Sequence, residues 1–97
     1  MEQRTREVVR DDAMSGEPRI EGTRVTVLRI AALVEESGLA AQTVADKYDL
    51  DVADVYRALT YYHENPDVVA EVRRERREAE EEVAEREDTV RLSELRG

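Results

Sequence analysis

The sequence predicts a mainly α-helical protein in which a short N-terminal β-hairpin precedes a three-helix helix-turn-helix body and a long, charged C-terminal helix. Three observations lead to this fold class. Apolar residues recur at spacings of three and four in successive segments between residues 27 and 62. Two short runs before Gly22 suit strands, and a highly charged, helix-prone segment follows Asn65 and Pro66. We therefore divide the chain into a disordered N-terminus (1–6), a body (7–65) and a charged helical extension (66–97).

Two short runs form the predicted β-element. Residues 7–10 hold Val8 and Val9, loop residues follow in the sequence DDAMSGEP, and residues 18–21 suit a second strand that begins with a proline. An isolated two-stranded hairpin is marginally stable in water. We therefore expect this element to lean on the helices or to pair with another copy of the chain.

Gly22 marks the change from strand to helix. A glycine after a strand permits the positive φ of a sharp turn, so we interpret Gly22 and Thr23 as a structural turn rather than a ligand contact. Thr26 is a good N-cap, and Gly38 is placed to end the helix that follows. The helical spacing between these two points is carried by Val27, Ile30, Ala31 and Val34.

The next two segments have the pattern of a helix-turn-helix. The apolar spacing occurs at Ala41, Val44, Ala45 and Tyr48, and again at Val52, Val55, Tyr56 and Leu59, continuing to Tyr62. The break between them, residues 49–51, has the length of such a turn, although the usual turn glycine is missing. Asp51 and Asp54 resemble a capping box in which Asp replaces Glu.

The segment after Pro66 is predicted to be a charged helix that reaches about residue 95. Its apolar positions form a thin stripe interrupted by Arg76 and Arg86, which disfavours self-association as a coiled coil. Eleven acidic residues and seven arginines give this segment −4 of the net charge of −9. We expect such a helix to be ordered by a partner.

Composition limits the class of protein. Acidic residues number 24 against 15 basic ones, and Lys47 is the single lysine. This bias suggests a salt-adapted protein, as in halophilic archaea with GC-rich genomes. At about 1 M salt the Debye length is about 3 Å, which weakens repulsion from DNA and phosphate contacts alike. The chain has no cysteine, no long apolar run and no signal peptide, so we expect a cytoplasmic protein without disulfides or membrane contact.

Several stretches of the body carry a family resemblance. These are SGEPRIEGTRVTV, then Gly38, then VADKYDLDVADVYRALTYY. With these stretches, the chain from about residue 8 to residue 62 resembles the domain-of-unknown-function 433 family. The resemblance implies a small β-element with a helix-turn-helix, and a role as an antitoxin-like partner of nucleases with a PIN-like fold. Ala40 stands where the family usually has a capping serine, and the segment after Pro66 lies largely outside the resemblance.

No group of residues has the pattern of a catalytic or metal site. His63, the only histidine, lies near the predicted end of a helix, where it suits capping or the helix dipole better than catalysis. Four aspartates lie close together in the sequence, Asp46, Asp49, Asp51 and Asp54. They are better explained as caps and a solvated face than as a metal cage. We expect a protein that is not an enzyme and that needs no cofactor.

One functional hypothesis is DNA binding by a homodimer, with the helix from Val52 in the major groove of the protein's own promoter. The candidate contacts are Arg24, Arg29, Lys47 and Arg57. Arg57 is placed to donate hydrogen bonds to a guanine, but the nearby carboxylates of Asp51 and Asp54 would repel phosphates. The alternative is a three-helix core that keeps the helix-turn-helix shape without binding DNA.

The other hypothesis, compatible with the first, is protein interaction through the C-terminal segment. Acidic residues there suit the cationic surface on which a PIN-like nuclease toxin holds RNA. The candidate contacts lie on one stripe of an amphipathic helix: Val69, Val72, Ala79, Val83 and Val90. Two alternatives remain, a helix that only keeps the protein soluble in brine, and a pure interaction or structural dimer module without DNA binding.

Overall fold

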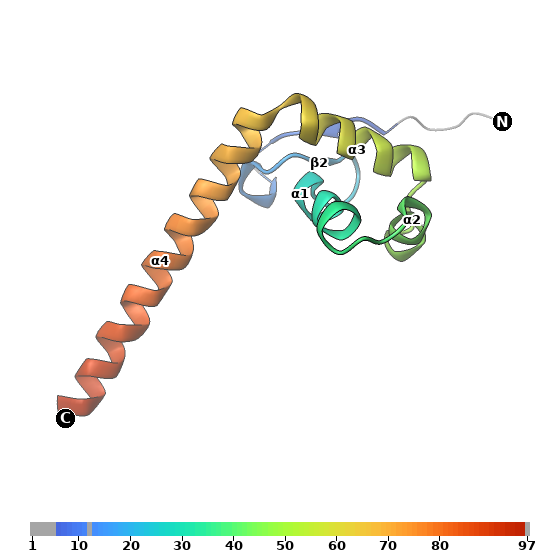
Figure 1. Cartoon of the computed structure of the whole chain (residues 1–97). Coiled ribbons are helices and arrows are strands. Elements are labelled where there is room, and N and C mark those ends of the chain that lie inside the picture. Colours follow the sequence, from blue (N-terminus) through green and yellow to red (C-terminus); the bar gives the residue numbers. More distant parts are fainter. Residues whose placement is uncertain (1–5, 12, 97) are drawn as a thin grey trace. The chain divides into compact units, whose positions relative to one another are not determined.

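The computed structural model describes residues 6–11 and 13–96, together with their side chains except those of residues 13, 14 and 88–96. The elements follow in the order β1 (Val8–Val9), the 3-10 turn η1 (Ala13–Gly16), β2 (Arg19–Ile20), α1 (Val27–Ala31), the π-helical turn η2 (Ala32–Glu36), α2 (Ala41–Tyr48), α3 (Val52–Glu64) and α4 (Pro66–Arg96) (Figure 1). The predicted fold class is confirmed. Most of the N-terminus predicted to be disordered, residues 1–5, lies outside the described residues.

The chain divides into two compact units, residues 1–66 and 67–97. The second unit consists almost entirely of α4, a continuous helix of 31 residues. Over residues 6–11 and 13–96, neither α4 nor any other helix is both long and apolar enough to cross a bilayer.

The strand pair is short and is supported by the helices of the first unit. Val8 lies opposite Ile20 and Val9 opposite Arg19 in an antiparallel register. The second edge of β2 is covered by the chain that returns toward α1, because the Ile20 amide donates to the Val25 carbonyl at 3.0 Å. Ile20 is fully buried, and both strands contact α3. Of the two expected supports for the hairpin, packing against the helices is therefore present.

Gly22 and Thr23 make the turn that follows β2. The Thr23 amide donates to the Ile20 carbonyl at 3.0 Å, and Gly22 has a φ of 75° at the third turn position, as a type II turn requires. The Thr23 hydroxyl donates to the same carbonyl at 2.8 Å and accepts from the Val25 amide at 3.1 Å. A Cβ on Gly22 would meet nothing within 4 Å, so glycine is needed here for its φ rather than for space.

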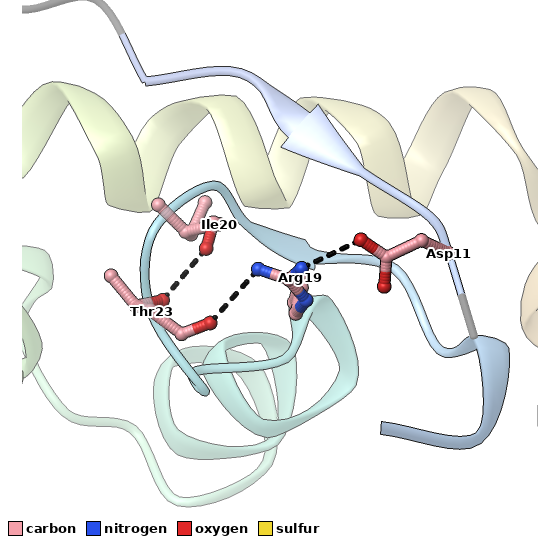
Figure 2. Close-up of polar contacts among 4 residues, drawn as sticks. All are labelled: Asp11, Arg19, Ile20 and Thr23. Atoms are coloured by element: carbon pink, nitrogen blue, oxygen red, sulfur yellow. Dashed lines mark hydrogen bonds and ion pairs between the residues drawn. The ribbon is translucent and has the colours of Figure 1, made fainter. Parts of the chain in front are cut away.

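Arg19 ties this turn to the segment after β1 (Figure 2). Its Nη1 donates to the Thr23 carbonyl at 3.1 Å, and its Nη2 lies 2.7 Å from Asp11 Oδ2. The Arg19 Nε is buried and has no hydrogen-bond partner in the part of the chain described. The guanidinium of Arg19 thus links the turn after β2 to the segment after β1.

The three body helices enclose one core. α1 and α2 both pack against α3. The buried cluster consists of Ile20, Val27, Ile30, Val44, Ala45, Leu50, Val55 and Ala58. Thr26 caps α1 as predicted, its Oγ1 accepting from the Arg29 amide at 3.2 Å. The helix then widens into η2, where the Ser37 amide donates to the Ala32 carbonyl at 2.9 Å, and ends at Gly38 with a φ of 73°.

All four aromatic residues of the chain are tyrosines on α2 and α3. Tyr48, Tyr61 and Tyr62 are partly buried against the core cluster. The fourth, Tyr56, was expected on the apolar stripe, but its exposed fraction is 57%. The prediction that Tyr56 lies on the buried face of α3 is therefore wrong, and Ala58 lies in the core instead.

Candidate functional site

The turn between α2 and α3 completes the helix-turn-helix without a glycine. Asp49 adopts the left-handed conformation, with a φ of 55°. The Leu50 amide donates to the Ala45 carbonyl at 2.8 Å, and the Asp49 amide reaches the Asp46 carbonyl at 3.5 Å. These two bonds form a Schellman motif, whose left-handed position usually holds glycine. Asp49 therefore takes the role of the missing turn glycine, since aspartate is one of the few other residues that tolerate this conformation.

A buried carboxylate begins α3. Asp54 is fully buried, and its Oδ2 accepts from the Asp51 amide at 3.1 Å. The Asp51 side chain accepts from the Asp54 amide in return, so the predicted capping box is confirmed. Its Oδ1 accepts from Arg57 Nη1 at 2.9 Å. A buried carboxylate is tolerated only when it is paired or hydrogen-bonded. Arg57 is thus the counter-ion of Asp54, in addition to any contact that its exposed part makes.

The four candidate DNA contacts lie on four different parts of the body. Arg24 follows the turn at Gly22, Arg29 lies on α1 and Lys47 on α2, and all three are exposed. Lys47 Nζ lies 5.7 Å from the centre of the Tyr48 ring. Of the four, Arg57 alone lines the concave surface described next.

That surface is a groove of about 500 Å³ between β1 and α3. It is lined by Glu7, Val8, Ala53, Tyr56, Arg57, Thr60, Tyr61 and Glu64. The six α3 residues recur at spacings of three and four, so they form one face of the helix. We call this surface the α3 groove. Sequence reasoning missed it because Glu7 and Val8 are more than forty residues from α3, although the spacing of Tyr56, Thr60 and Glu64 was a visible signal.

The charges of the α3 groove suit a protein better than a polyanion. Glu7 and Glu64 contribute two carboxylates, and the arginine opposing them, Arg57, is already paired with Asp54. Affinity for DNA rests largely on cations that neutralise phosphates. The groove instead contains two tyrosines and an arginine, which are residue types enriched in protein interfaces.

A family model described as "Protein of unknown function (DUF433)" matches residues 8–62, more than half of the chain. This chain belongs to the DUF433 family. The match begins at β1 and covers every residue of the α3 groove except Glu7 and Glu64. Comparison with curated proteins and with solved structures gave no match.

His63, the only histidine of the chain, lies one residue after the DUF433 match and has two neighbours in the body. His63 Nε2 lies 2.6 Å from Glu35 Oε2, which joins α3 to η2 at the surface. The His63 ring also meets the Tyr62 ring edge to face, with centroids 5.1 Å apart. Among the residues that the structure describes, no three or more His, Cys, Asp or Glu side chains gather where they could hold a metal ion.

Beyond the DUF433 region, the predicted partner stripe of α4 divides into two parts. Val69 and Val72 are buried, whereas Ala79 is exposed and Val83 has an exposed fraction of 51%. The side chain of Val90 lies outside the described residues. From residue 73 to residue 87 every side chain is exposed, and Arg86 Nη2 lies 2.7 Å from Glu82 Oε1 one turn away. The part of the stripe that is open to a partner therefore starts at Ala79.

Proposed function

We propose that this DUF433 protein is an antitoxin-like regulator of a toxin–antitoxin pair that neutralises a PIN-like nuclease through α4. The observation that supports this most directly is the exposed stretch of α4, residues 73–87, where no described side chain is buried. A helix of this length without a buried face has little to stabilise it in isolation. Binding to a partner supplies the missing burial.

The charge of this stretch supports a cationic partner. Glu78, Glu80, Glu81, Glu82 and Glu85 follow one another within about two turns of helix. An RNA-cleaving enzyme needs a cationic channel for its substrate, and an acidic helix is electrostatically complementary to such a channel. Ala79 and Val83, spaced four residues apart, offer an apolar contact on the same helix.

The test is inhibition of a PIN-like nuclease, sought first among the genes next to this one and measured as RNA cleavage. A chain that ends after Arg77 keeps the buried Val69 and Val72 and should lose inhibition. The triple variant Glu80→Gln, Glu81→Gln, Glu82→Gln should weaken inhibition at least about tenfold, which corresponds to about 1.4 kcal/mol. Inhibition by the shortened chain would assign the inhibitory surface to the body instead.

A matched control removes the same number of charges from the body. The variant Glu21→Gln, Glu36→Gln, Asp46→Asn changes three exposed acids outside α4 and outside the α3 groove. It should inhibit as well as the unchanged protein. Equal losses in the two triple variants would mean that net charge alone, and not the α4 surface, determines binding.

We also propose that the body binds DNA as an operator-reading regulator. The geometry in favour is the α2–α3 pair, closed by the Schellman motif at Asp49 and the capping box at Asp51. Binding to the promoter fragment should fall linearly with the logarithm of salt concentration and exceed binding to a random duplex. No binding at any salt would leave the alternative, an interaction or dimer module without DNA.

Composition supports a cytoplasmic location in a salt-adapted cell. The net charge of −9 destabilises the folded chain through self-repulsion, and salt screens that repulsion. The midpoint of thermal unfolding should therefore rise between 0.1 M and 3 M KCl. An unchanged or falling midpoint would remove this part of the proposal.

A further inference from the structure

β1 has one edge that is paired and one that the described residues leave open. The Glu21 amide donates to the Glu7 carbonyl at 2.9 Å, so Glu7 and Glu21 form a hydrogen-bonded pair of the ladder. Such pairs alternate with non-bonded pairs along antiparallel strands. The amide and carbonyl of Val8, opposite Ile20, therefore point away from β2. Because the return chain covers the other edge of β2, β1 supplies the open edge of this sheet.

The α3 groove beside this strand presents an aromatic ring. Tyr56 is one of two large apolar side chains, with Val83, that stay exposed in the described part of the chain. Ala53 and Thr60 lie one turn before and one turn after it on the same face, and both are small. This leaves room for a second chain to approach the ring. Tyrosine is enriched in protein interfaces because it buries a large area while keeping a polar tip.

The charges of the groove make it complementary to itself. Arg57 pairs with Asp54 but keeps a side chain that is 36% exposed, and it lies on the same surface as Glu7 and Glu64. A two-fold axis brings the same patch of two copies together, so a patch with both signs can set an arginine of one copy against a carboxylate of the other. The acidic stretch of α4 lacks this property, because its charges between residues 78 and 85 are all negative.

We infer that the α3 groove receives a second copy of this chain, in a two-fold dimer whose β1 strands pair antiparallel at Val8. Val8 of one copy then exchanges two backbone hydrogen bonds with Val8 of the other, and a four-stranded sheet crosses the axis. Tyr56 of each copy is covered in the groove. This inference does not rest on the antitoxin role, and nuclease inhibition is measured separately.

The dimer has a consequence for DNA binding. The groove occupies the outward face of α3, from Ala53 to Glu64, which the helix-turn-helix hypothesis assigns to the major groove. A dimer of this kind covers that face. The dimer and base reading by α3 therefore exclude each other, and in the dimer any DNA contact falls to exposed residues outside the groove, such as Arg24, Arg29 and Lys47.

The first test is the mass of the full chain by light scattering at about 100 µM in 1 M and 3 M KCl. The expected mass is twice 11.1 kDa. Tyr56→Glu should reduce it to 11.1 kDa, because the exposed ring tolerates replacement but the interface does not tolerate a buried charge. Thr43→Glu adds the same charge at an exposed position of α2 outside the groove and should leave the dimer intact. Circular dichroism checks that both variants are folded.

The second test locates the contact and uses the absence of cysteine in this chain. A hydrogen-bonded antiparallel pair has Cα atoms about 5.5 Å apart, which suits a disulfide. Val8→Cys should therefore cross-link two copies in oxidised glutathione, and Thr43→Cys should not. A monomeric unchanged protein, a dimeric Tyr56→Glu variant, or a dimer without the Val8→Cys cross-link would each overturn the inference. A monomer whose groove binds the nuclease would assign the groove to that partner.

Discussion

Arg57 Nη1 lies 2.9 Å from Asp54 Oδ1, and the two side chains differ sharply in exposure: that of Asp54 is fully buried, whereas that of Arg57 is 36% exposed. The pair spans one turn of α3, directly after the helix-turn-helix turn. A residue that would otherwise be interpreted as a base contact is therefore part of the structure that holds the start of α3. Loss of function on changing Arg57 has to be separated from loss of folding.

We predict that Arg57→Ala lowers the free energy of unfolding by about 1–3 kcal/mol, because a buried carboxylate loses its counter-ion. The loss stays in this range because Asp54 keeps the Asp51 amide and Arg57 is partly solvated. Chemical unfolding in constant salt measures the effect. Adding Asp54→Asn to Arg57→Ala should recover part of it, since an amide is less costly to bury than a charge. A double variant as unstable as the sum of the single variants would contradict this interpretation.

Replacing Asp49 tests the turn of the helix-turn-helix. Glycine adopts its left-handed conformation without the strain of a side chain, so Asp49→Gly should be neutral or stabilise by up to about 1 kcal/mol. Asp49→Val should destabilise by roughly 1–2 kcal/mol, because a β-branched side chain is poorly tolerated at this φ. Thermal unfolding of the two variants gives the comparison. Equal midpoints would show that Asp49 is not held in this conformation.

The start of α2 lacks a side-chain cap. Ala40 has the extended backbone of an N-cap residue, with φ −64° and ψ 145°, and its side chain makes no hydrogen bond. Ala40→Ser should therefore raise the free energy of unfolding by about 1 kcal/mol. Ala41→Ser, one position into the helix, is the control and should not stabilise. The prediction fails if the two serines act alike.

Gly22 should resist substitution although the space around it is open. Gly22→Ala should cost about 1–2 kcal/mol, because an L side chain is strained at a φ of 75°. Gly22→Asn should cost less, since asparagine enters this region more readily. The measurement is the midpoint of chemical unfolding. A loss ordered by side-chain size instead of backbone preference would point to a steric role.

Periodicity predicted the helices but not how their faces are used. Regular apolar spacing located α1, α2 and α3, and the Asp51 and Asp54 pair located the start of α3. From the same spacing we predicted Tyr56 in the core, where Ala58 is found instead. We also predicted that Asp54 is solvated, whereas it is fully buried. Asp54 can be buried because it pairs with the guanidinium of Arg57, one turn away. The spacing of apolar residues gives no information about such a pair. The π-helical turn at Ala32–Glu36 was not predicted either, because it changes the backbone hydrogen bonds and not the order of apolar residues.

The α3 groove was beyond sequence reasoning because it joins residues distant in the chain. Glu7 and Val8 reach α3 only after the hairpin has folded, and the hairpin is set by Gly22 and by the bonds of Arg19. In α4 the stripe of valines was visible in the sequence. That Val69 and Val72 are buried while Val83 is exposed was not, because identical side chains at heptad spacing look alike.

The placement of all four tyrosines between residues 48 and 62 makes the two units optically separable. The chain has no tryptophan, so its near-ultraviolet dichroism and its fluorescence arise only from α2 and α3. Far-ultraviolet dichroism near 222 nm, in contrast, comes from the helices of both units, and the 31 residues of α4 make it the longest of them. In a single denaturant titration, the near-ultraviolet signal therefore follows the first unit alone, and a change at 222 nm that occurs without it belongs to α4. Binding that orders α4 should appear at 222 nm alone.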